Sequence, residues 1–239
     1  MSFCSELVER VDSDRYVLSL FAGDREKMEA LCAIYAFHYE IARIRESVTD
    51  TNMGLVRMQW WRDGLRGLNP SYTNEIMVEV KEAQARYDIP YELFDDLMVA
   101  REFDLEGVQP ADLSGFYLYA ESIEKALGAL VSKIVGVNLS VDLCRAYGVQ
   151  GLLRAFVSHA KQGRCYLPGG HKEVLVRDVV RDQLLKLEDI CLECRADRYT
   201  KAMWRLSYLY LKRIQKLRCN IEDARVNDPL RFRYLRLLL

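Results

Sequence analysis

Helical periodicity constrains the fold of this chain more than any other feature of its sequence. From Asp24 to Val48, apolar residues recur three and four positions apart on two overlapping rows, which is the spacing of one broad helix face. Similar spacing returns in later segments, and no segment shows the sustained alternation of a strand bounded by turns. The sequence therefore predicts an all-α fold.

Glycine, proline and capping residues divide this pattern into separate helices. Gly23 and Asp24 precede the first long helix, and Asp50 is expected to cap the next one. No repeat of solenoid length is present, so we expect one domain over residues 1–239. The predicted helices are Asp24–Val48, Gly54–Leu65, Glu75–Tyr87, Tyr91–Glu106, Asp112–Val137, Asp142–Lys161, one or two within Arg177–Leu217, and a short last helix opened by Asp228 and Pro229.

Charge and composition limit the classes of partner. Lys and Arg number 34 against 35 Asp and Glu, so the balance offers no overall attraction to nucleic acid. Acidic residues near the start argue against a signal or transit peptide, and no apolar run reaches the roughly 18 residues of a membrane span. We expect a cytoplasmic protein with no nucleic-acid partner and at most peripheral membrane contact.

The seven cysteines are scattered, which favours reduced thiols that pack as small core residues. Cys191 and Cys194 form a CxxC, but no second pair stands at zinc-site spacing, so we interpret them as structural. The basic and apolar segment Leu230–Leu239 is short for a bilayer helix and is expected to pack into the core.

Four segments carry a family resemblance. Residues 33–46 read AIYAFHYEIARIRE, 57–63 read RMQWWRD, 118–128 read LYAESIEKALG, and 151–168 read GLLRAFVSHAKQGRCYLP. In this order they resemble the characteristic segments of the squalene/phytoene synthase family. The pattern is most similar to a degenerate branch that contains the mitochondrial complex I assembly factor and its bacterial relatives. The resemblance implies an isoprenoid-synthase-like helical bundle around a central cavity.

The first motif has lost the carboxylates that this resemblance implies. Active members carry aspartates four residues apart on one helix face, where they hold magnesium and the substrate diphosphate. The corresponding positions here are Ala42, Arg43 and Glu46. With Arg45 included, two positive charges and one negative charge leave the motif at +1. A cluster of divalent ions is therefore not expected.

The second motif has lost its metal-binding groups as well. The family's asparagine falls on Gly151, and the acidic positions that follow include Ala155 and His159. We therefore predict no catalytic residue, no metal site and no cofactor, with magnesium required only if the chain is an enzyme after all. Glu124 and Lys125 stand where the family has small cavity-wall residues, so a long prenyl chain would lose room if they point inward.

Two other pairs of acids have the spacing of the missing ligands. Glu46 and Asp50 are four residues apart, but Asp50 is expected to cap a helix. Asp178 and Asp182 are also four apart, and we interpret them as the solvated first turn of a helix. Neither pair is our preferred metal site.

Basic residues near the motifs suggest a different kind of site. Guanidinium groups bind phosphate oxygens without a metal ion, so these residues are candidates for a metal-free anion pocket. The alternative is that they are ion-paired or face solvent. The candidates are Arg43, Arg45, Arg57, Arg62, Arg154 and Arg164, with Lys161 nearby.

Histidine and aromatic residues complete the candidate positions. We expect His159 and His38 to be hydrogen-bonded core histidines rather than ligands or bases. Tyr166 is expected to pack beneath the second motif. Trp60 and Trp61 point about 100° apart on a helix, so one is expected in the core and the other available to a partner or lipid.

Three functions follow from these residues. The preferred one is a non-catalytic member of the family with a binding or assembly role, either in respiratory complex assembly or in handling isoprenoids or lipids. Its ligand would be an isoprenoid or an anionic lipid, and its partner a protein. The second is a prenyltransferase that condenses prenyl diphosphates head to head, with arginines alone stabilising the departing diphosphate. The third is a helical interaction module with no ligand.

Overall fold

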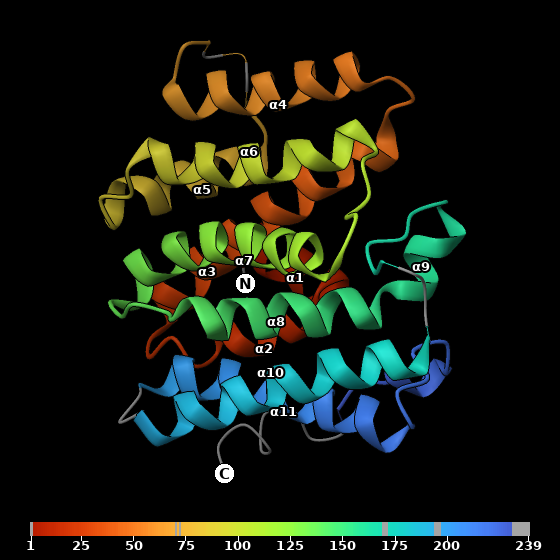
Figure 1. Ribbon diagram of the computed structural model, residues 1–239. Helices are drawn as coiled ribbons and strands as arrows, with labels where there is room; N and C mark the ends of the chain where they lie inside the picture. The colour runs from red at the N-terminus through yellow and green to blue at the C-terminus, as the bar shows by residue number, and fades with distance from the viewer. Residues whose placement is uncertain (1, 70, 72, 169–171, 194–196, 231–239) are drawn as a thin grey trace. The chain divides into compact units, whose positions relative to one another are not determined.

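The computed structural model describes residues 2–69, 71, 73–168, 172–193 and 197–230, with only the backbone given for 191–193. Within this part of the chain every regular element is a helix (Figure 1). The all-α prediction is therefore confirmed. The α-helices are α1 (Phe3–Val11), α2 (Ser13–Ser19), α3 (Arg25–Arg43), α4 (Thr51–Arg66), α5 (Glu75–Arg86), α6 (Tyr91–Glu106), α7 (Leu113–Val135), α8 (Val141–Arg154), α9 (Phe156–Lys161), α10 (Glu173–Glu193) and α11 (Arg198–Lys216), and the 3-10 helices are η1 (Ile44–Ser47) and η2 (Ala224–Val226).

Capping side chains fix where these helices begin. Asp24 accepts a hydrogen bond from the backbone N–H of Lys27 at 2.8 Å, which satisfies one of the free donors at the start of α3. Asp50 does the same for α4, as predicted. At the other end of α4, Gly67 adopts a left-handed conformation with φ 70°, which favours glycine. Both N-terminal boundaries were therefore readable from the sequence.

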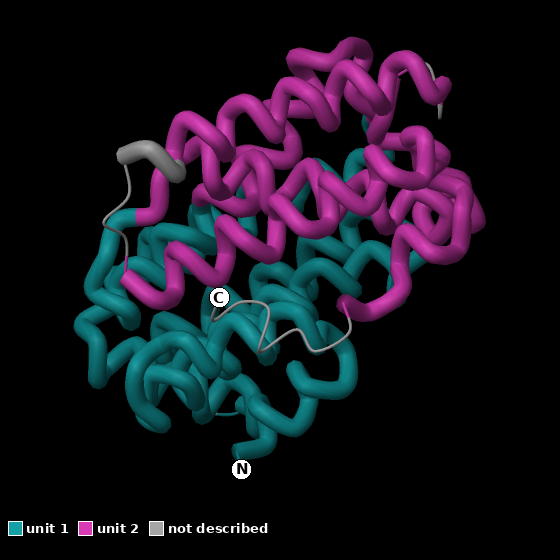
Figure 2. Tube along the Cα trace, turned by 90° about the horizontal axis from the view of Figure 1, so that it is seen from below, with its two compact units in different colours: residues 1–108, 126–138 teal, residues 109–125, 139–239 magenta. Residues whose placement is uncertain are grey.

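The chain forms two compact units (Figure 2). Unit 1 contains residues 1–108 and 126–138, and unit 2 contains residues 109–125 and 139–239. Helix α7 contributes its first half to unit 2 and its second half to unit 1. That residues 1–239 form a single domain stays a prediction.

The core of unit 1 is organised around α3. Every residue from 30 to 38 is buried, and α3 packs against α1, α2, α5 and α6. The ring of Phe37 meets Trp61 edge-on at 5.2 Å and Phe94 at 5.7 Å. Each fully buried side chain of this kind stabilises the fold by about 2 kcal/mol. The first motif therefore stands at the end of the most deeply buried helix of this unit.

Unit 2 is built on α8, which packs against α10 and α11 (Figure 1). The first half of α7 is tied to α8 by Arg145, whose Nη2 donates to Glu121 Oε2 at 2.6 Å. The two helices approach so closely that a Cβ at Gly148 would lie 2.6 Å from the carbonyl oxygen of Ala120. Position 148 therefore requires glycine.

Two predicted helices were too long. Asp24–Val48 ends as an α-helix at Arg43, where η1 follows. Asp142–Lys161 is divided, because α8 ends at Arg154 and α9 begins at Phe156. The chain leaves the helix at Ala155, where ψ is −1°, and Phe156 is buried just beyond the break. Alanine is the strongest helix former, so the local sequence carries no signal for this break. The predicted last helix lies almost wholly outside the described residues.

Candidate functional site

The first motif spans the point where α3 tightens into η1. Ala42 is half-buried and Arg43 is exposed at the end of α3, whereas Glu46 lies exposed on η1. Residues four apart share a face only in a continuous α-helix, and a 3-10 turn rotates them apart. The positions of Ala42 and Glu46 therefore do not reproduce the paired-ligand geometry.

Three predicted anion-binding arginines surround this turn. Arg43 lies 3.6 Å from Glu40, and its guanidinium stands 5.0 Å from the ring centre of Tyr39. Arg45 donates to the carbonyl of Val48 at 3.4 Å. Arg57, which comes from α4, donates to the hydroxyl of Ser47. Arg45 and Arg57 thus bond neutral oxygens, whereas Arg43 lies near a carboxylate.

A pocket of about 300 Å³ opens between these residues, and we call it the arginine pocket. All its walls belong to unit 1, from the end of α3, η1, α4 and the cap of α5. It combines cations, one carboxylate, neutral hydrogen-bonding groups and two indoles. The residues that line it are Glu40, Arg43, Ile44, Ser47, Arg57, Trp60, Trp61 and Asn74.

The two tryptophans divide as the sequence predicted. Trp61 is 5% exposed and packs on Phe37, whereas Trp60 is half-buried. Their rings meet edge-on at 5.1 Å. The pocket therefore has an apolar wall that is anchored in the core of unit 1.

Arg62 has a different environment from the arginines of the pocket. Its side chain is 14% exposed, with Nε 2.6 Å from Asp95 and Nη1 2.7 Å from Glu102. Burial lowers the pKa of Arg62, but the hydrogen bonds that it donates to Asp95 and Glu102 outweigh that effect and raise the pKa above its ordinary value. Arg62 therefore joins α4 to α6, and we no longer include it among the anion-binding candidates.

His38 is a buried, hydrogen-bonded histidine, as predicted. Its Nε2 is bonded to Nη2 of Arg101, and Arg101 also bonds Asp104 at 3.1 Å. Burial, together with the positive charges of Arg101 and Arg15, holds the pKa of His38 well below its usual value. Because a guanidinium only donates, His38 must accept as a neutral ring. It supports α3 from within the core.

The second motif lies in unit 2, on α8 and α9. Gly151 is half-buried on α8, and a Cβ there would meet nothing within 4 Å. Ala155 occupies the break between the helices, and His159 follows on α9. The break separates Gly151 from His159. Ala155 and His159 still lie on one helical turn, because the backbone N–H of His159 donates to the carbonyl of Ala155 at 2.9 Å. Neither side chain is a carboxylate, so the second motif differs from the family in its residue types rather than in its spacing.

Aromatic rings surround the positions of the lost carboxylates in unit 2. His159 is half-buried rather than in the core, with its ring edge-on to Tyr166 at 5.0 Å. Tyr166 is buried, and its ring is stacked on Tyr119 at 4.6 Å with 5° between the planes. The predicted packing role of Tyr166 is confirmed. We call His159, Tyr166 and Tyr119 the aromatic stack.

The basic candidates of unit 2 differ in their surroundings. Arg154 lies over Tyr210, with its guanidinium carbon 3.5 Å from the ring centre, and also donates to Gln150 at 3.2 Å. Arg164 is half-buried and Lys161 is exposed. Stacking on Tyr210 holds Arg154 against the protein rather than presenting it to an anion.

The structure also places Glu124 and Lys125. Glu124 is 8% exposed, and its Cγ lies 2.9 Å from the position that a Cβ would take at Gly148. Lys125 is exposed. Glu124 is therefore the residue of the two that takes up interior space, next to α8.

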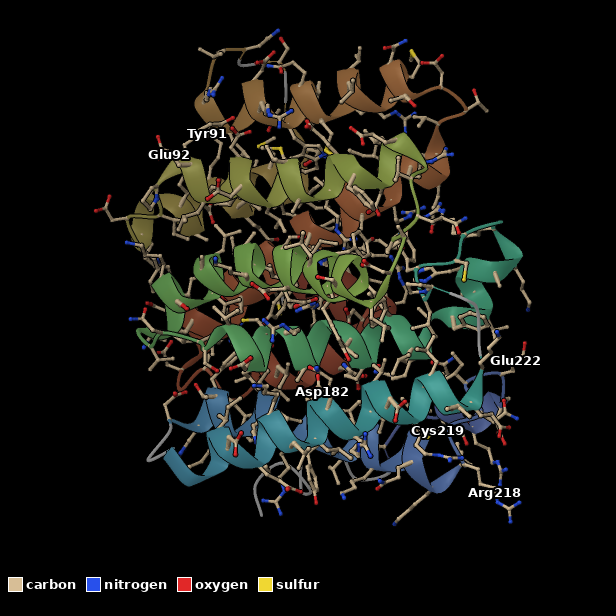
Figure 3. All side chains as sticks on the ribbon, in the orientation of Figure 1. Tyr91, Glu92, Asp182, Arg218, Cys219 and Glu222 are labelled. Carbon is tan, nitrogen blue, oxygen red and sulfur yellow. The ribbon has the colours of Figure 1, made fainter. Side chains whose placement is uncertain are left out.

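Acids of both shifted pairs are engaged in other contacts. The side chain of Asp50 caps α4, as predicted, by accepting from the backbone N–H groups of Asn52 and Met53. Asp178 pairs with Arg181 at 3.4 Å. Asp182, labelled in Figure 3, accepts from Gln183 at 2.8 Å. Burial raises the pKa of Tyr117 to about 12, and a hydrogen bond to the Asp182 carboxylate adds to the shift.

Magnesium, which active members of the resembled family use, needs several hard oxygen ligands. Among the described residues, no group of three or more His, Cys, Asp or Glu side chains is placed to hold a metal ion. At the first motif the groups present are mainly guanidiniums, which repel a divalent cation. The donor set of this chain therefore does not fit magnesium.

Several residues of the site were missed by sequence reasoning. Glu40, Ser47 and Asn74 line the arginine pocket, and Arg101 and Asp104 support His38. Glu40 and Ser47 flank the motif closely enough to have been considered, since they lie within one turn of Arg43. Arg101 and Asp104 stand about sixty residues from His38 in the chain, so no local spacing identifies them. The CxxC prediction lies outside the described side chains.

Comparison with known proteins gives a family and a fold. The model of the squalene/phytoene synthase family matches residues 8–231. The crystal structure of a dehydrosqualene synthase in complex with a ligand has the same fold, with a TM-score of 0.76 at 15% identity, over 99% of this chain and 93% of that one. In the described part of the chain, no helix has the length and apolar character needed to cross a membrane.

Curated relatives carry two kinds of name. NADH dehydrogenase (ubiquinone) complex I, assembly factor 6 is 28% identical in Bos taurus and 26% in Homo sapiens, in each case over 70% of this chain and 52% of that protein. Presqualene diphosphate synthase of Rhodopseudomonas palustris is 25% identical over 60% of this chain and 54% of that enzyme. The chain thus spans about half the length of the curated relatives it matches.

Proposed function

Because the chain belongs to the squalene/phytoene synthase family, we propose that it is a non-catalytic member that uses the inherited helical fold in the assembly of respiratory complex I. The observation that carries the proposal is the loss of metal-binding carboxylates from both motifs. Ala42 and Arg43 replace two aspartates of the first motif, and Gly151, Ala155 and His159 occupy positions of the second. The relatives named as complex I assembly factors supply the role.

The site chemistry supports a non-catalytic protein. Ionising a prenyl diphosphate requires stabilisation of the negative charge on the departing group, and metal ions supply it in the family. In the first motif α3 ends inside the ligand spacing, at Arg43, so single substitutions to aspartate would not restore a ligand pair on one helix face there. In the second motif Ala155 and His159 lie on one helical turn, but neither side chain is a carboxylate. In this proposal the protein needs no metal or organic cofactor.

The partner is proposed to be a protein, with membrane contact at most peripheral. Helix α4 offers an exposed apolar stripe, because Met53 is 54% exposed and Val56 is 61% exposed, three residues apart on the same face. Exposed apolar groups of this kind suit transient contact with a protein surface. The cytoplasmic location predicted from the sequence is part of the same proposal.

The assembly role is tested by deleting the gene in the organism that carries it. We expect NADH:quinone oxidoreductase activity of its membranes to fall, while succinate:quinone oxidoreductase activity stays unchanged as the control. A plasmid copy of the wild-type gene should restore the activity. Full NADH oxidoreductase activity and normal complex I on native gels after deletion would contradict the role.

A prenyltransferase remains the second candidate, favoured by the relative named presqualene diphosphate synthase. It predicts that the purified protein releases pyrophosphate from farnesyl or geranylgeranyl diphosphate in the presence of magnesium. The third candidate, a helical interaction module that binds no small ligand, predicts neither pyrophosphate release nor binding of any phosphate compound. Pyrophosphate release separates the enzyme from the other two candidates, and the gene deletion tests the assembly role.

A further inference from the structure

The residues of the arginine pocket indicate a binding function that does not depend on the assembly role. Its two cations, Arg43 and Arg57, come from different helices and line one concave surface of about 300 Å³. That volume lies at the lower end of the range for small-molecule sites. Guanidinium groups present several N–H donors in a plane and no acceptor, which matches the oxygens of a phosphate. The pocket therefore has both the size and the donors for a small oxyanion.

Both arginines are held loosely by the protein. Arg43 lies 3.6 Å from Glu40 and 5.0 Å from the ring centre of Tyr39, and its side chain is 52% exposed. Arg57 is exposed and donates to a neutral hydroxyl, that of Ser47. Arg62, which follows the pocket residue Trp61 in the chain, shows the contrasting case, because two carboxylates hold it at 2.6 and 2.7 Å. An entering phosphate thus competes with one carboxylate, that of Glu40, whose contact with Arg43 is long and screened by solvent.

The remaining walls complete a binding site. Ser47 can donate a hydroxyl hydrogen bond, and Trp60 and Trp61 offer apolar ring surface beside the cations. Trp61 is fixed by its contact with Phe37, so this wall is rigid before any ligand arrives. Two guanidiniums and one carboxylate leave the pocket at +1. A phosphate attached to a small apolar group satisfies both the charge and the indoles.

We propose that the arginine pocket binds the phosphate group of a small molecule or of a lipid head group, without a metal ion, through Arg43 and Arg57. Glu40 opposes this binding, because its carboxylate lies next to Arg43 and repels the anion. The arrangement replaces a carboxylate and metal site by a direct cation site at the end of the same helix.

The three tryptophans provide both the signals for a binding test and its control. Trp60 and Trp61 line the pocket, whereas Trp204 lies in unit 2 with its indole N–H bonded to the carbonyl of Leu187. Inorganic phosphate and then pyrophosphate are titrated into ¹⁵N-labelled protein in the presence of EDTA, and the indole N–H signals are followed by NMR. We expect saturable shifts of the Trp60 and Trp61 signals and no shift of Trp204.

Substitutions give effects of opposite sign. Arg43→Gln and Arg57→Gln should each weaken phosphate binding about tenfold, the loss expected for one charge-assisted hydrogen bond. Glu40→Gln should tighten it about threefold by removing the repelling charge. Arg25→Gln is the matched control, because Arg25 is an exposed arginine of the same unit that pairs with Glu29 outside the pocket. Tighter binding by Glu40→Gln has no explanation in misfolding.

Vesicles identify the source of the phosphate. Stronger flotation with phosphatidylcholine vesicles containing phosphatidic acid than with those containing phosphatidylserine at equal charge would place the phosphate on a lipid. Binding of soluble phosphate with no preference between the vesicles would place it on a soluble molecule. Equal shifts of all three indoles, shifts that require magnesium, or affinities unchanged by Arg43→Gln and Arg57→Gln would overturn the proposal.

Discussion

The two motif regions have lost the same chemistry in different ways. In unit 1 the motif ends a deeply buried helix and opens onto a pocket whose polar groups include Arg43 and Arg57. In unit 2 the motif lies at a helix break, and stacked rings of Tyr119 and Tyr166 fill its surroundings. In the first region arginines stand near the positions of the lost carboxylates. In the second region packed aromatic rings lie near them. The difference indicates that unit 1 kept a concave polar site and unit 2 kept mainly a structural role.

The largest effect should come from the close approach of α7 and α8 in unit 2. Gly148→Ala places a Cβ 2.6 Å from the backbone oxygen of Ala120, which cannot move without shifting a helix. We expect the free energy of unfolding to fall by about 3 kcal/mol, measured by urea denaturation. Gly151→Ala, one turn further along α8, is the control, because a Cβ there meets nothing within 4 Å. It should be neutral or stabilising by up to about 1 kcal/mol. Equal losses at both positions would contradict the close packing.

A smaller loss should distinguish the two kinds of arginine in unit 1. Arg62→Met leaves Asp95 and Glu102 without their shared cation, and we expect a loss of about 2 kcal/mol in urea denaturation. Arg57→Met removes an exposed cation of the pocket and should change stability by less than about 0.5 kcal/mol. If Arg57→Met lowers the free energy of unfolding as much as Arg62→Met does, Arg57 has a structural role and the arginine pocket is not a free binding site.

The buried histidine of unit 1 should make stability depend on pH. The pKa of His38 lies well below its ordinary 6.5 in the folded protein, so the unfolded chain binds more protons as the pH falls below about 6.5. The free energy of unfolding should therefore decrease toward pH 5, by up to about 1.4 kcal/mol per pH unit. His38→Gln should remove most of this slope, whereas His159→Gln in unit 2 should keep it. An unchanged slope in His38→Gln would show that a group other than His38 causes the pH dependence.

The smallest effect concerns the aromatic stack of unit 2. Tyr119→Leu and Tyr166→Leu, combined in a double-mutant cycle, should give a coupling energy of about 1 kcal/mol for rings stacked at 4.6 Å. The reference pair is Trp204 and Tyr208, stacked at 5.1 Å on one helix away from the motif. A coupling near zero would mean that the rings fill space without stabilising the second motif.

Much of the fold could be predicted because local signals were strong. Asp24 and Asp50 cap helices as their positions indicate, and α6 has the predicted bounds Tyr91–Glu106. The break at Ala155 could not be predicted, since alanine favours a continuous helix and tertiary packing decides the backbone there. Local propensity is a weak guide where a buried residue such as Phe156 sets the chain direction.

The candidate site was only partly readable from the sequence. The family resemblance located both motifs, and helical spacing separated Trp61 from Trp60. The sequence could not show which arginines are ion-paired. Arg57 and Arg62 lie five residues apart on one helix, but α6 supplies carboxylate partners to Arg62. Long-range carboxylates such as Asp95 are invisible to local patterns, and they decide which cations are available.

We infer that this chain keeps the family fold without metal-dependent prenyl transfer. The most direct test of this inference is the release of pyrophosphate by the purified protein from farnesyl or geranylgeranyl diphosphate, with magnesium and a reductant present and an active family member as the positive control. We predict no release above the protein-free blank, with or without EDTA. Repeated turnover that EDTA abolishes would contradict the claim.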